Sequence, residues 1–443
     1  MVTSRLPGFY KLTLEERRRI AAEALGVDVR ELEAAIGDGG MDAERADKTI
    51  ENVVGTYAMP FSLGLNVQIN GRDYLAPMVV EEPSVVAAAS NASKIIRGGG
   101  GFEAESDPPL MIAQIQLDDV SDPKAARAAI LAEADTLLAM ADACVPNLVA
   151  RGGGARGVEV RDLGDGWLVV HLLVDCRDAM GANLVNTVAE SLSDRIGELA
   201  GGRVGLRILS NLSDRRNVRV RCSIPVSELA FEHYSGEVVR DRIVRASTFA
   251  ERDPYRAATH NKGTMNGVDP VVIATGNDWR AVEAGAHAFA ARNGTYQPLC
   301  TWRLGDDGAL VGFMEIPLAL GTVGGTLRVH DGARFGLKIA GVDSAQELSM
   351  LAACVGMASN FAALRALTTD GIQRGHMALH ARSVAIGAGA RGDHVEKVAH
   401  AIHQAGSVSL ESARKVLRRL TGVGVAPSGG VTPSGSVALP LGE

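Results

Sequence analysis

The chain has 443 residues, with 45 Lys and Arg side chains against 52 Asp and Glu, so its formal net charge is −7. An acidic balance argues against a nucleic acid as the main partner, because phosphate contacts need a basic face. The hydrophobic share of 46% and the charged share of 22% are those of a globular protein rather than a disordered one. The length suffices for two or three domains with buried cores.

Targeting and redox signals predict a cytoplasmic location. The N-terminal residues contain no apolar segment typical of a secretory signal, and no apolar run reaches the roughly 18 residues that span a bilayer. The five cysteines show no CxxC motif and no regular spacing, which disfavours a disulfide framework or a zinc ribbon. We therefore expect a soluble cytoplasmic protein with no membrane partner.

Taken in chain order, hydrophobic periodicity predicts the following elements. Residues 14–35 alternate charged and apolar side chains at helical spacing and are predicted to form one or two surface helices. Residues 109–211 have the clearest periodicity, and their predicted elements follow the order β-α-β-β-α-β, which is typical of a ferredoxin-like unit. Its elements are a strand at 109–117, a helix at 123–143, two strands joined by the turn Gly164-Asp165-Gly166, a helix at 181–200 and a strand at 203–209. Amphipathic helices near 392–405 and 408–420 precede a Gly- and Pro-rich tail.

This order predicts the α+β fold class, with a discontinuous large mixed α/β domain and an inserted ferredoxin-like small domain. We expect the large domain to comprise residues 1–108 and 216–372. The small domain would comprise residues 109–215, and a C-terminal helical part with a disordered tail would comprise residues 373–443.

Two glycine motifs and one histidine pair have ligand-like spacing but the wrong context. GxGxxG spacing starts at Gly152 and again at Gly387, yet neither lies in the strand–turn–helix unit that binds dinucleotides. His376 and His380 stand at i and i+4, with Met377 where zinc proteases carry their catalytic glutamate. We therefore predict neither a Rossmann site nor a metal site. One of the histidines remains a candidate proton donor, because imidazole titrates near neutral pH.

Two carboxylates interrupt an apolar passage at Glu81-Glu82-Pro83-Ser84. Pro83 suits the first position of a helix, and a preceding Glu would then lie at the positive end of that helix. One interpretation is capping by an exposed acid. The other is a partly buried carboxyl that holds a proton near neutral pH and acts as a general acid.

Lys262 lies in the polar segment 256–266, which shows little helix or strand periodicity. It is either an incidental lysine on a surface loop or a point charge that stabilises a developing alkoxide. Asp278 follows the apolar run 271–274, interpreted as a strand, and precedes a helix. It is therefore either an N-cap or a catalytic carboxylate at the end of a strand. Segment 175–183 leads from a strand into a helix and would bind an anion or merely form a turn.

Six segments together resemble 3-hydroxy-3-methylglutaryl-CoA (HMG-CoA) reductase, in its bacterial-type soluble class II form. They are ENVVG at 51–55, EEPSVVAA at 81–88, DAMGAN at 178–183, THNKGTMNG at 259–267, ATGNDWRA at 274–281 and GHMALHAR at 375–382. The segments follow the family's order along most of the chain. The resemblance implies a four-electron, two-hydride interconversion of HMG-CoA and mevalonate plus coenzyme A, through mevaldehyde.

The resemblance also implies four catalytic roles. Lys262 would hold the carbonyl oxygen and stabilise the developing alkoxide, and Glu82 would donate a proton in the aldehyde step. Asp278 would connect Lys262 and Glu82 through hydrogen bonds. His376, on a C-terminal helical flap, would protonate the departing thiolate of coenzyme A. This division is physically sensible, because hydride addition builds negative charge on oxygen and a thiolate leaves more readily when protonated.

The binding residues implied by the resemblance fall into two groups. The substrate would lie on the large domain, near Ser84, Asn211, Arg256 and Asn266. The nicotinamide dinucleotide would bind the small domain, without a Rossmann fold, through Asp178, Ala179, Met180, Gly181 and Asn183. No metal is implied. Subunits would form a homodimer, or an assembly of dimers, with each active site at the dimer interface.

Two departures from the family pattern concern the ligands. NADH-preferring relatives carry an acid on the helix before the GGG turn, where this chain has Val145, with Asp142 the nearest acid. Residues 133–150 contain no Lys or Arg for the 2′-phosphate of NADP(H), so NAD(H) is favoured. Ser359 stands where the family pattern has a glutamine, which leaves that substrate contact unassigned.

A competing hypothesis is a catalytically inactive sensor that binds a coenzyme A thioester through the ferredoxin-like unit. Such units often serve as ligand-binding modules. The intact set of Glu82, Lys262, Asp278 and His376 argues against this hypothesis.

Overall fold

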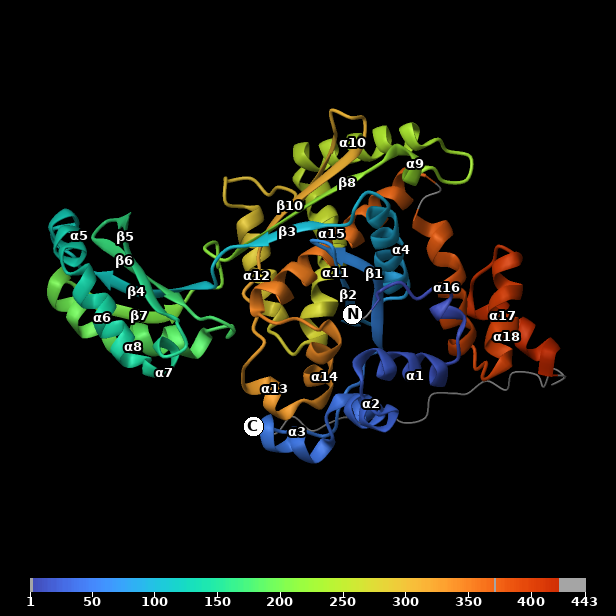
Figure 1. Cartoon of the computed structure of the whole chain (residues 1–443), viewed down its shortest axis with the longest axis horizontal. Coiled ribbons are helices and arrows are strands. Elements are labelled where there is room, and N and C mark those ends of the chain that lie inside the picture. Colours follow the sequence, from blue (N-terminus) through green and yellow to red (C-terminus); the bar gives the residue numbers. More distant parts are fainter. Residues whose placement is uncertain (1–2, 370–371, 422–443) are drawn as a thin grey trace, which may run out of the picture. The chain divides into compact units, whose positions relative to one another are not determined.

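A computed structural model describes residues 3–369 and 372–421 of the chain, with the backbone alone for residues 372–379. These residues form two compact units, which divide at residue 371. The first unit is a mixed α/β structure with three antiparallel sheets (Figure 1). The second unit consists of helices.

The N-terminal part of the first unit is helical, as residues 14–35 predict. Helix α1 begins with a capping box in which the Thr13 hydroxyl accepts the Glu16 N–H and the Glu16 carboxylate accepts the Thr13 N–H. Two strands form a hairpin that packs against the helix following it. The elements of this part are α1 (Leu14–Leu25), α2 (Val29–Ile36), α3 (Ala43–Thr49), β1 (Phe61–Ile69), β2 (Arg72–Val79) and α4 (Val85–Gly98).

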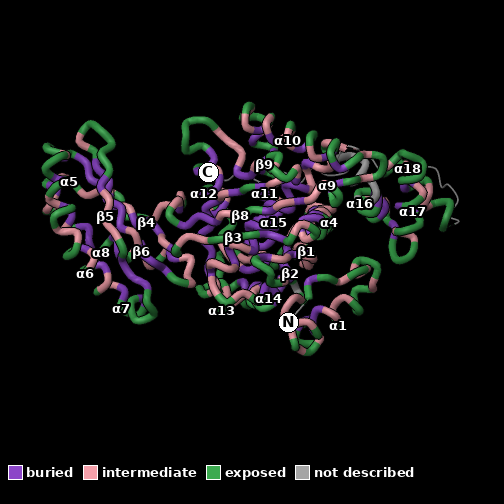
Figure 2. The backbone as a smooth tube through the Cα atoms, turned by 45° about the horizontal axis from the view of Figure 1, so that its top comes forward, coloured by how far each residue is buried: buried purple, intermediate pink, exposed green. Residues whose placement is uncertain are grey.

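A four-stranded sheet and long helices form the main core of the first unit. The sheet order is β3-β8-β10-β9, with strands β3 (Glu103–Ser106), β8 (Asn217–Ile224), β9 (Cys300–Leu304) and β10 (Leu310–Pro317). Its helices are α9 (Val226–Leu229), α10 (Gly236–Arg252), α11 (Pro254–Ala274), α12 (Trp279–Ala290), α13 (Gly325–Val329), α14 (Asp331–Ala340) and α15 (Ala345–Thr368). Buried residues run through this sheet, α11 and α15 (Figure 2).

Lys262 lies on helix α11, which the weak periodicity of residues 256–266 did not predict, so the alternative of a surface-loop lysine is wrong. The sequence of α11 is poor in helix formers, but Asp253 caps its start by accepting the N–H groups of Tyr255 and Arg256, and Pro254 occupies the first turn. Tertiary packing supplies the remaining stabilisation of this helix. A Cβ on Gly267 would collide with the backbone of α15, and one on Gly356 of α15 would lie 2.6 Å from a methyl group of α11. The two glycines therefore allow a close helix crossing.

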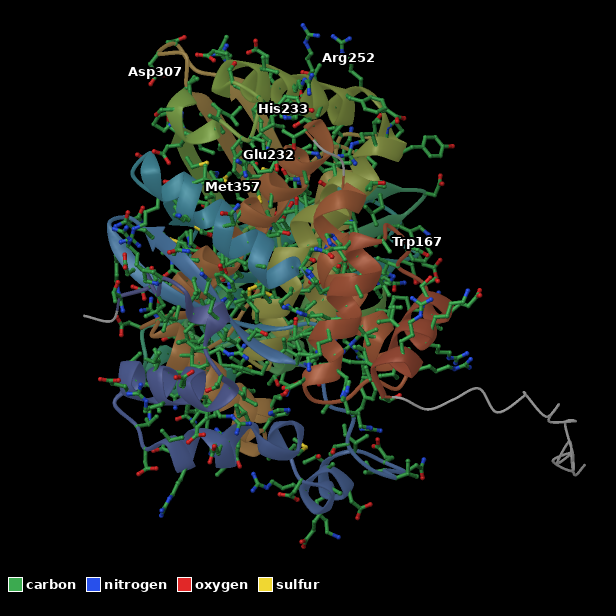
Figure 3. All side chains as sticks on the ribbon, turned by 90° about the vertical axis from the view of Figure 1, so that its right-hand side faces the viewer. Trp167, Glu232, His233, Arg252, Asp307 and Met357 are labelled. Carbon is green, nitrogen blue, oxygen red and sulfur yellow. The ribbon has the colours of Figure 1, made fainter. Side chains whose placement is uncertain are left out.

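Helix α15 is long and apolar enough, by length and composition, to cross a membrane. Most of it is nevertheless buried inside the first unit, as is usual for the core helix of a soluble protein. Met357 on this helix is fully buried, whereas Arg252 at the end of α10 is exposed (Figure 3).

The segment between β3 and β8 forms a second four-stranded sheet with the order β5-β6-β4-β7. Its own core is separate from the main core. The elements are β4 (Leu110–Asp118), α5 (Pro123–Ala132), α6 (Ala134–Cys144), α7 (Pro146–Val149), β5 (Gly154–Gly164), β6 (Trp167–Asp175), α8 (Ala182–Ala200) and β7 (Arg203–Leu209). The expected single helix at 123–143 is wrong, because the helical hydrogen bonding stops at Glu133 and restarts in α6.

The second unit has three helices around a small core of alanine, valine and isoleucine. They are α16 (Ile372–Gly387), α17 (Asp393–Gln404) and α18 (Leu410–Thr421), the last two close to the predicted bounds. The tail after residue 421 lies outside the described residues.

Candidate active site

The clearest polar contact of the candidate site joins two elements far apart in the sequence. Glu82 lies in the turn between β2 and α4, and Lys262 lies on α11. The Lys262 Nζ atom donates a hydrogen bond to Glu82 Oε2 at 2.8 Å. The two side chains remain 61% and 39% exposed, respectively, so a substrate can reach both. The structure therefore places a cation and a carboxyl together at an accessible position.

The turn that carries Glu82 differs from the expected start of a helix. Pro83 does not begin α4, which starts at Val85 with Ser84 as its N-cap residue. Ser84 has a left-handed backbone with φ of 79°, which is unusual for a residue with a side chain. Its buried hydroxyl oxygen has no hydrogen-bond partner among the described residues. A buried hydroxyl in that state is suited to a ligand, because an unmade hydrogen bond costs about 1–3 kcal/mol.

One side of α11 carries polar residues at helical spacing: Arg256, Thr259, Lys262, Asn266 and Asp269. Arg256 is half-buried, and its burial lowers the pKa of the guanidinium. Its guanidinium makes no hydrogen bond or ion pair with the residues in the described ranges. Asn266 is half-buried one turn beyond Lys262. This side of α11 thus carries the guanidinium of Arg256, the ammonium of Lys262 and the amide of Asn266, in that order along the helix.

Asp278 begins α12 and has partners other than those expected. Its carboxylate accepts the N–H groups of Arg280 and Ala281, both at 3.1 Å, and pairs with the Arg280 guanidinium at 3.2 Å. The capping role is therefore present, while a connection to Lys262 and Glu82 stays a prediction. The run 271–274 before it is the end of α11, so the expected strand is wrong. Short apolar runs do not distinguish a strand from a buried helix.

Asn211 lies between β7 and β8 and is exposed. Its carbonyl oxygen approaches Gly285 of α12, where an added Cβ would lie at 2.6 Å. Asn211 is thereby held against the helix that begins at Asp278. Ser359, by contrast, is 7% exposed within α15.

The segment at 178–183 connects the small sheet to the main core. The Asp178 carboxylate accepts the Ala345 N–H at 3.0 Å, and the Asp178 carbonyl accepts the Thr322 N–H at 2.8 Å. The guanidinium of Arg216, only 1% exposed, donates to the carbonyls of Ala179, Met180 and Leu320. Burial lowers the pKa of Arg216 to about 10, so the group remains charged at neutral pH. Asp178 thus performs a structural task that the sequence did not reveal.

The same segment ends at the start of α8. Gly181 is the N-cap residue with φ of 104°, and a Cβ there would collide with Cys176. Glycine is required on both counts. Asn183 is exposed in the first turn, where helix N–H groups favour an anion. Ala179 and Met180 are half-buried.

The GGG turn lies at the start of β5, next to the end of β6. An added Cβ on Gly153 would lie 2.6 Å from the Asp175 carbonyl, so the turn and the strand are in close contact. The Asp142 carboxylate accepts the Ala155 N–H at 2.7 Å, whereas Val145 is 5% exposed within the core. Asp142, rather than Val145, is therefore the residue that faces this turn.

Asn277, a polar residue that the sequence did not single out, organises part of the site. Asn277, next to Asp278, accepts the Gly321 N–H at 2.7 Å and donates to the Gly321 carbonyl at 3.1 Å. Gly321 in turn packs against the backbone of Asp178 and Met180. Asn277 therefore links the start of α12 to segment 178–183. Only the pairing of these separate segments in the fold reveals such roles.

His376 is on α16, and its side chain lies outside the described residues. Among the residues that are described, no group of three His, Cys, Asp or Glu side chains is placed to bind a metal ion.

Comparisons with known proteins identify the family. The profile of the family described as hydroxymethylglutaryl-coenzyme A reductase matches residues 13–381. The chain belongs to this family. It is 47% identical over 422 residues to 3-hydroxy-3-methylglutaryl-coenzyme A reductase of Archaeoglobus fulgidus, with 95% of each chain covered. It is 36% identical to the probable reductase of Borreliella burgdorferi over 337 residues, covering 76% of this chain and 77% of the relative.

Solved structures of HMG-CoA reductase from Streptococcus pneumoniae share the fold. One has a TM-score of 0.80 and 42% identity, covering 94% of this chain and 99% of the other. Another, a class II reductase described as bound to NADPH in open conformations, has a TM-score of 0.79 and 43% identity, with 82% and 99% covered. The chain is thus a bacterial-type class II HMG-CoA reductase, an NAD(P)-dependent oxidoreductase. It catalyses the family's interconversion of HMG-CoA and mevalonate.

Proposed function

We propose that the Glu82–Lys262 pair carries the chemistry of both reduction steps. Each hydride transfer to a carbonyl carbon develops negative charge on the oxygen, and a positioned ammonium offsets that charge. Lys262 holds the carbonyl oxygen, and Glu82 donates the proton that the mevaldehyde step requires. The 2.8 Å contact between Lys262 Nζ and Glu82 Oε2 is the observation that supports this assignment most directly.

Asp278 and His376 complete the proposed catalytic set. Asp278 exchanges its contact with Arg280 for a hydrogen bond that links it to Lys262 and Glu82 when substrate is bound. His376 protonates the thiolate of coenzyme A as it departs. An ordinary thiol has a pKa of about 8.5, so the thiolate is basic enough to take this proton and leaves more readily when it does. Helices α16 to α18 act as the flap that delivers His376.

The substrate lies along α11 in this proposal. Arg256 binds an anionic group of HMG-CoA, because a guanidinium pairs with a carboxylate or phosphate through two parallel hydrogen bonds. Asn266, Asn211 and the Ser84 hydroxyl supply the remaining polar contacts. The absence of a partner for the buried Ser84 oxygen among the described residues supports its part in this set.

The nicotinamide dinucleotide binds the small domain at 178–183. Gly181 and Asn183, at the start of α8, would hold the pyrophosphate of the cofactor, because the first N–H groups of a helix favour an anion. Asp178, Ala179 and Met180 hold this loop in place. When bound, the dinucleotide would supply the hydride, and Lys262 would stabilise the charge that the hydride transfer develops on the carbonyl oxygen.

We propose that NADH is preferred over NADPH. The Asp142 carboxylate at the GGG turn would repel the 2′-phosphate of NADPH. Residues 133–150, which precede the turn, contain no basic side chain that could bind this phosphate. The relevant measurement is the ratio of kcat/KM for NADH to that for NADPH. Asp142→Ala should lower this ratio, whereas a ratio below one in the unmodified chain would make Arg151 and Arg156 the candidate 2′-phosphate ligands.

The functional domains follow the same assignment. Residues 1–108 and 216–372 form the substrate-binding and dimerisation domain, 109–215 the cofactor domain, and 373–443 the flap and tail. A second copy of the chain covers the extended segment before β1, in which Val54 and Tyr57 are almost completely exposed. We propose a homodimer, or an assembly of dimers, in the cytoplasm. Light scattering after gel filtration measures its mass.

The experiment that tests the catalytic assignment uses the full chain with HMG-CoA and either nicotinamide. We expect loss of the reduced-nicotinamide absorbance, and Lys262→Ala should lower turnover by at least about 10²-fold. Lys338→Ala is the matched control, because Lys338 also forms an exposed ion pair, with Glu31 at 3.2 Å. Thioester binding without oxidation of either nicotinamide would contradict the proposal and favour the sensor hypothesis.

A further inference from the structure

Four titratable side chains outside the proposed catalytic set form a continuous chain between α11, α12 and the loop after α12. The carboxyl groups of Asp269 on α11 and Glu283 on α12 are adjacent and can share a hydrogen bond when one of them holds a proton. Glu283 Oε2 lies 2.5 Å from His287 Nε2, one turn further along α12. His287 Nδ1 lies 2.6 Å from the hydroxyl oxygen of Tyr296 in the loop. All four residues are half-buried.

The protonation states in this chain follow from its surroundings. Burial, together with a hydrogen bond to Glu283 and the charge of Glu283, raises the pKa of Asp269 to about 8. The hydrogen bond from His287 lowers the pKa of Glu283, and the same hydrogen bond raises the pKa of His287. At neutral pH Asp269 therefore keeps its proton beside a Glu283 carboxylate, and the hydrogen bond to Glu283 favours the protonated form of His287.

The orphaned oxygen of Asp269 agrees with this assignment. Asp269 Oδ1 is buried, and no N–H or O–H donor among the described residues reaches it. An ionised carboxylate would be costly in that position, because a buried charge without donors loses its hydration. A carboxyl that keeps its own proton and donates it to Glu283 avoids that cost.

The series of side chains from Asp269 to Tyr296 contacts, at each of its two ends, a neighbour of a proposed catalytic residue. Asp269 follows Lys262 by seven residues on α11, about 10 Å along the helix, and Glu283 follows Asp278 by five on α12. At the other end, the Tyr296 side chain lies beside Asn261, which precedes Lys262. Asn261 also accepts the Leu299 N–H at 2.8 Å and donates to the Gln297 carbonyl at 2.9 Å.

We propose that the proton shared by Asp269 and Glu283, anchored through His287 and Tyr296, holds α12 against α11 and so positions Asp278 relative to Lys262. The inference rests on the proposed catalytic roles of Lys262 and Asp278. Asp269, Glu283 and His287 are positioning residues in this scheme, since they act through the two helices rather than on the substrate. Below, the term brace means Asp269, Glu283, His287 and Tyr296.

The brace makes activity dependent on pH. Above pH 8 Asp269 loses its proton, and two adjacent carboxylates then repel each other across the α11–α12 contact. Among the described residues, Glu283 raises the pKa of both Asp269 and Tyr296, while hydrogen bonds from His287 and Asp269 lower the pKa of Glu283. Displacement of the start of α12 by about 1 Å is enough to reduce turnover by as much as about 10²-fold.

The test compares Asp269→Asn with the unmodified full chain. The amide N–H of Asn donates to Glu283 at every pH, so the brace persists without a titrating proton. For a group titrating near pH 8, the unmodified kcat should fall about tenfold between pH 7 and pH 9, and the variant should fall less than about twofold. Asp269→Leu, which breaks the brace, should lower kcat across this range and leave KM for HMG-CoA nearly unchanged. The exposed Asp241→Asn on α10 is the control and should keep the unmodified profile.

A readout without turnover separates the two proposals. Infrared difference spectra between pH 7 and pH 9 should show loss of a protonated carboxyl band in the unmodified chain and none in Asp269→Asn. If the unmodified chain is active but shows no loss of the protonated carboxyl band, or if Asp269→Asn keeps the full alkaline fall in kcat, the brace is overturned. A chain inactive with both nicotinamides but with the expected band change would instead overturn the proposed function.

Discussion

The buried guanidinium of Arg216 offers the sharpest test of how the cofactor segment is held. Its three acceptors are the carbonyls of Ala179 and Met180, in segment 178–183, and of Leu320 in the main core. Arg216→Met keeps much of the volume but removes all five donors. Each buried carbonyl left without a partner costs about 1–3 kcal/mol, so we expect a loss of roughly 3–5 kcal/mol in the free energy of unfolding.

The functional consequence should appear in cofactor binding. Without Arg216 the segment loses its main attachment to the core, while Glu82 and Lys262 keep their contact. KM for the nicotinamide should therefore rise about tenfold or more, and KM for HMG-CoA should change little. Chemical denaturation followed by circular dichroism measures stability, and steady-state kinetics at saturating thioester measures KM.

The neighbouring Arg215 is the matched control. It pairs with Glu159 at 3.2 Å on the surface, and its side chain is 41% exposed. Arg215→Met should therefore cost at most about 1 kcal/mol. Equal stability of the two variants, together with an unchanged KM for the nicotinamide in Arg216→Met, would refute the role assigned to the buried guanidinium.

Three further changes test the packing around α11. Gly267→Ala forces a Cβ into the α15 backbone and should destabilise the chain by about 1–3 kcal/mol in denaturant titrations, whereas Gly263→Ala meets only an ordinary 3.7 Å contact and should be neutral or stabilising by up to about 1 kcal/mol. Asn360→Ala removes the acceptor of the buried Trp302 N–H, at 2.9 Å, and should lower Tm and change the tryptophan fluorescence; an unchanged Tm would refute this. Asp269→Asn should raise the stability of the folded chain at pH 8. In the unmodified chain the raised pKa of Asp269 means that folding stability falls as the pH rises from about 4 to 8, and the amide does not titrate. A Tm of the variant at or below that of the unmodified chain at pH 8 would contradict this expectation.

Regular periodicity made part of the fold predictable. In the β-α-β-β-α-β order predicted between 109 and 211, the four strands and the second helix agree with β4 to β7 and α8, whereas α5, α6 and α7 replace the first helix. Asp278 as a helix cap was equally legible from its place before an apolar helical run.

Tertiary packing decided what the sequence did not reveal. Helix α11 was not predicted, because residues 256–266 show little helical periodicity, yet Gly267 of this helix is what lets α15 approach. Glu82 and Lys262 are 180 residues apart, so only the family resemblance paired them. The roles of Arg216 and Asn277 could not be predicted from the sequence, because both side chains bind backbone groups of loops that are distant in the sequence.

The most direct measurement of the central claim is a double-mutant cycle on kcat/KM with Glu82→Gln, Lys262→Ala and the combined variant. If both groups act on the same oxygen, either single change disables the site, and the combined variant should be no worse than about threefold below the weaker single variant. Losses that multiply, so that the combined defect equals the product of the two single defects, would contradict a Glu82–Lys262 pair acting as one unit.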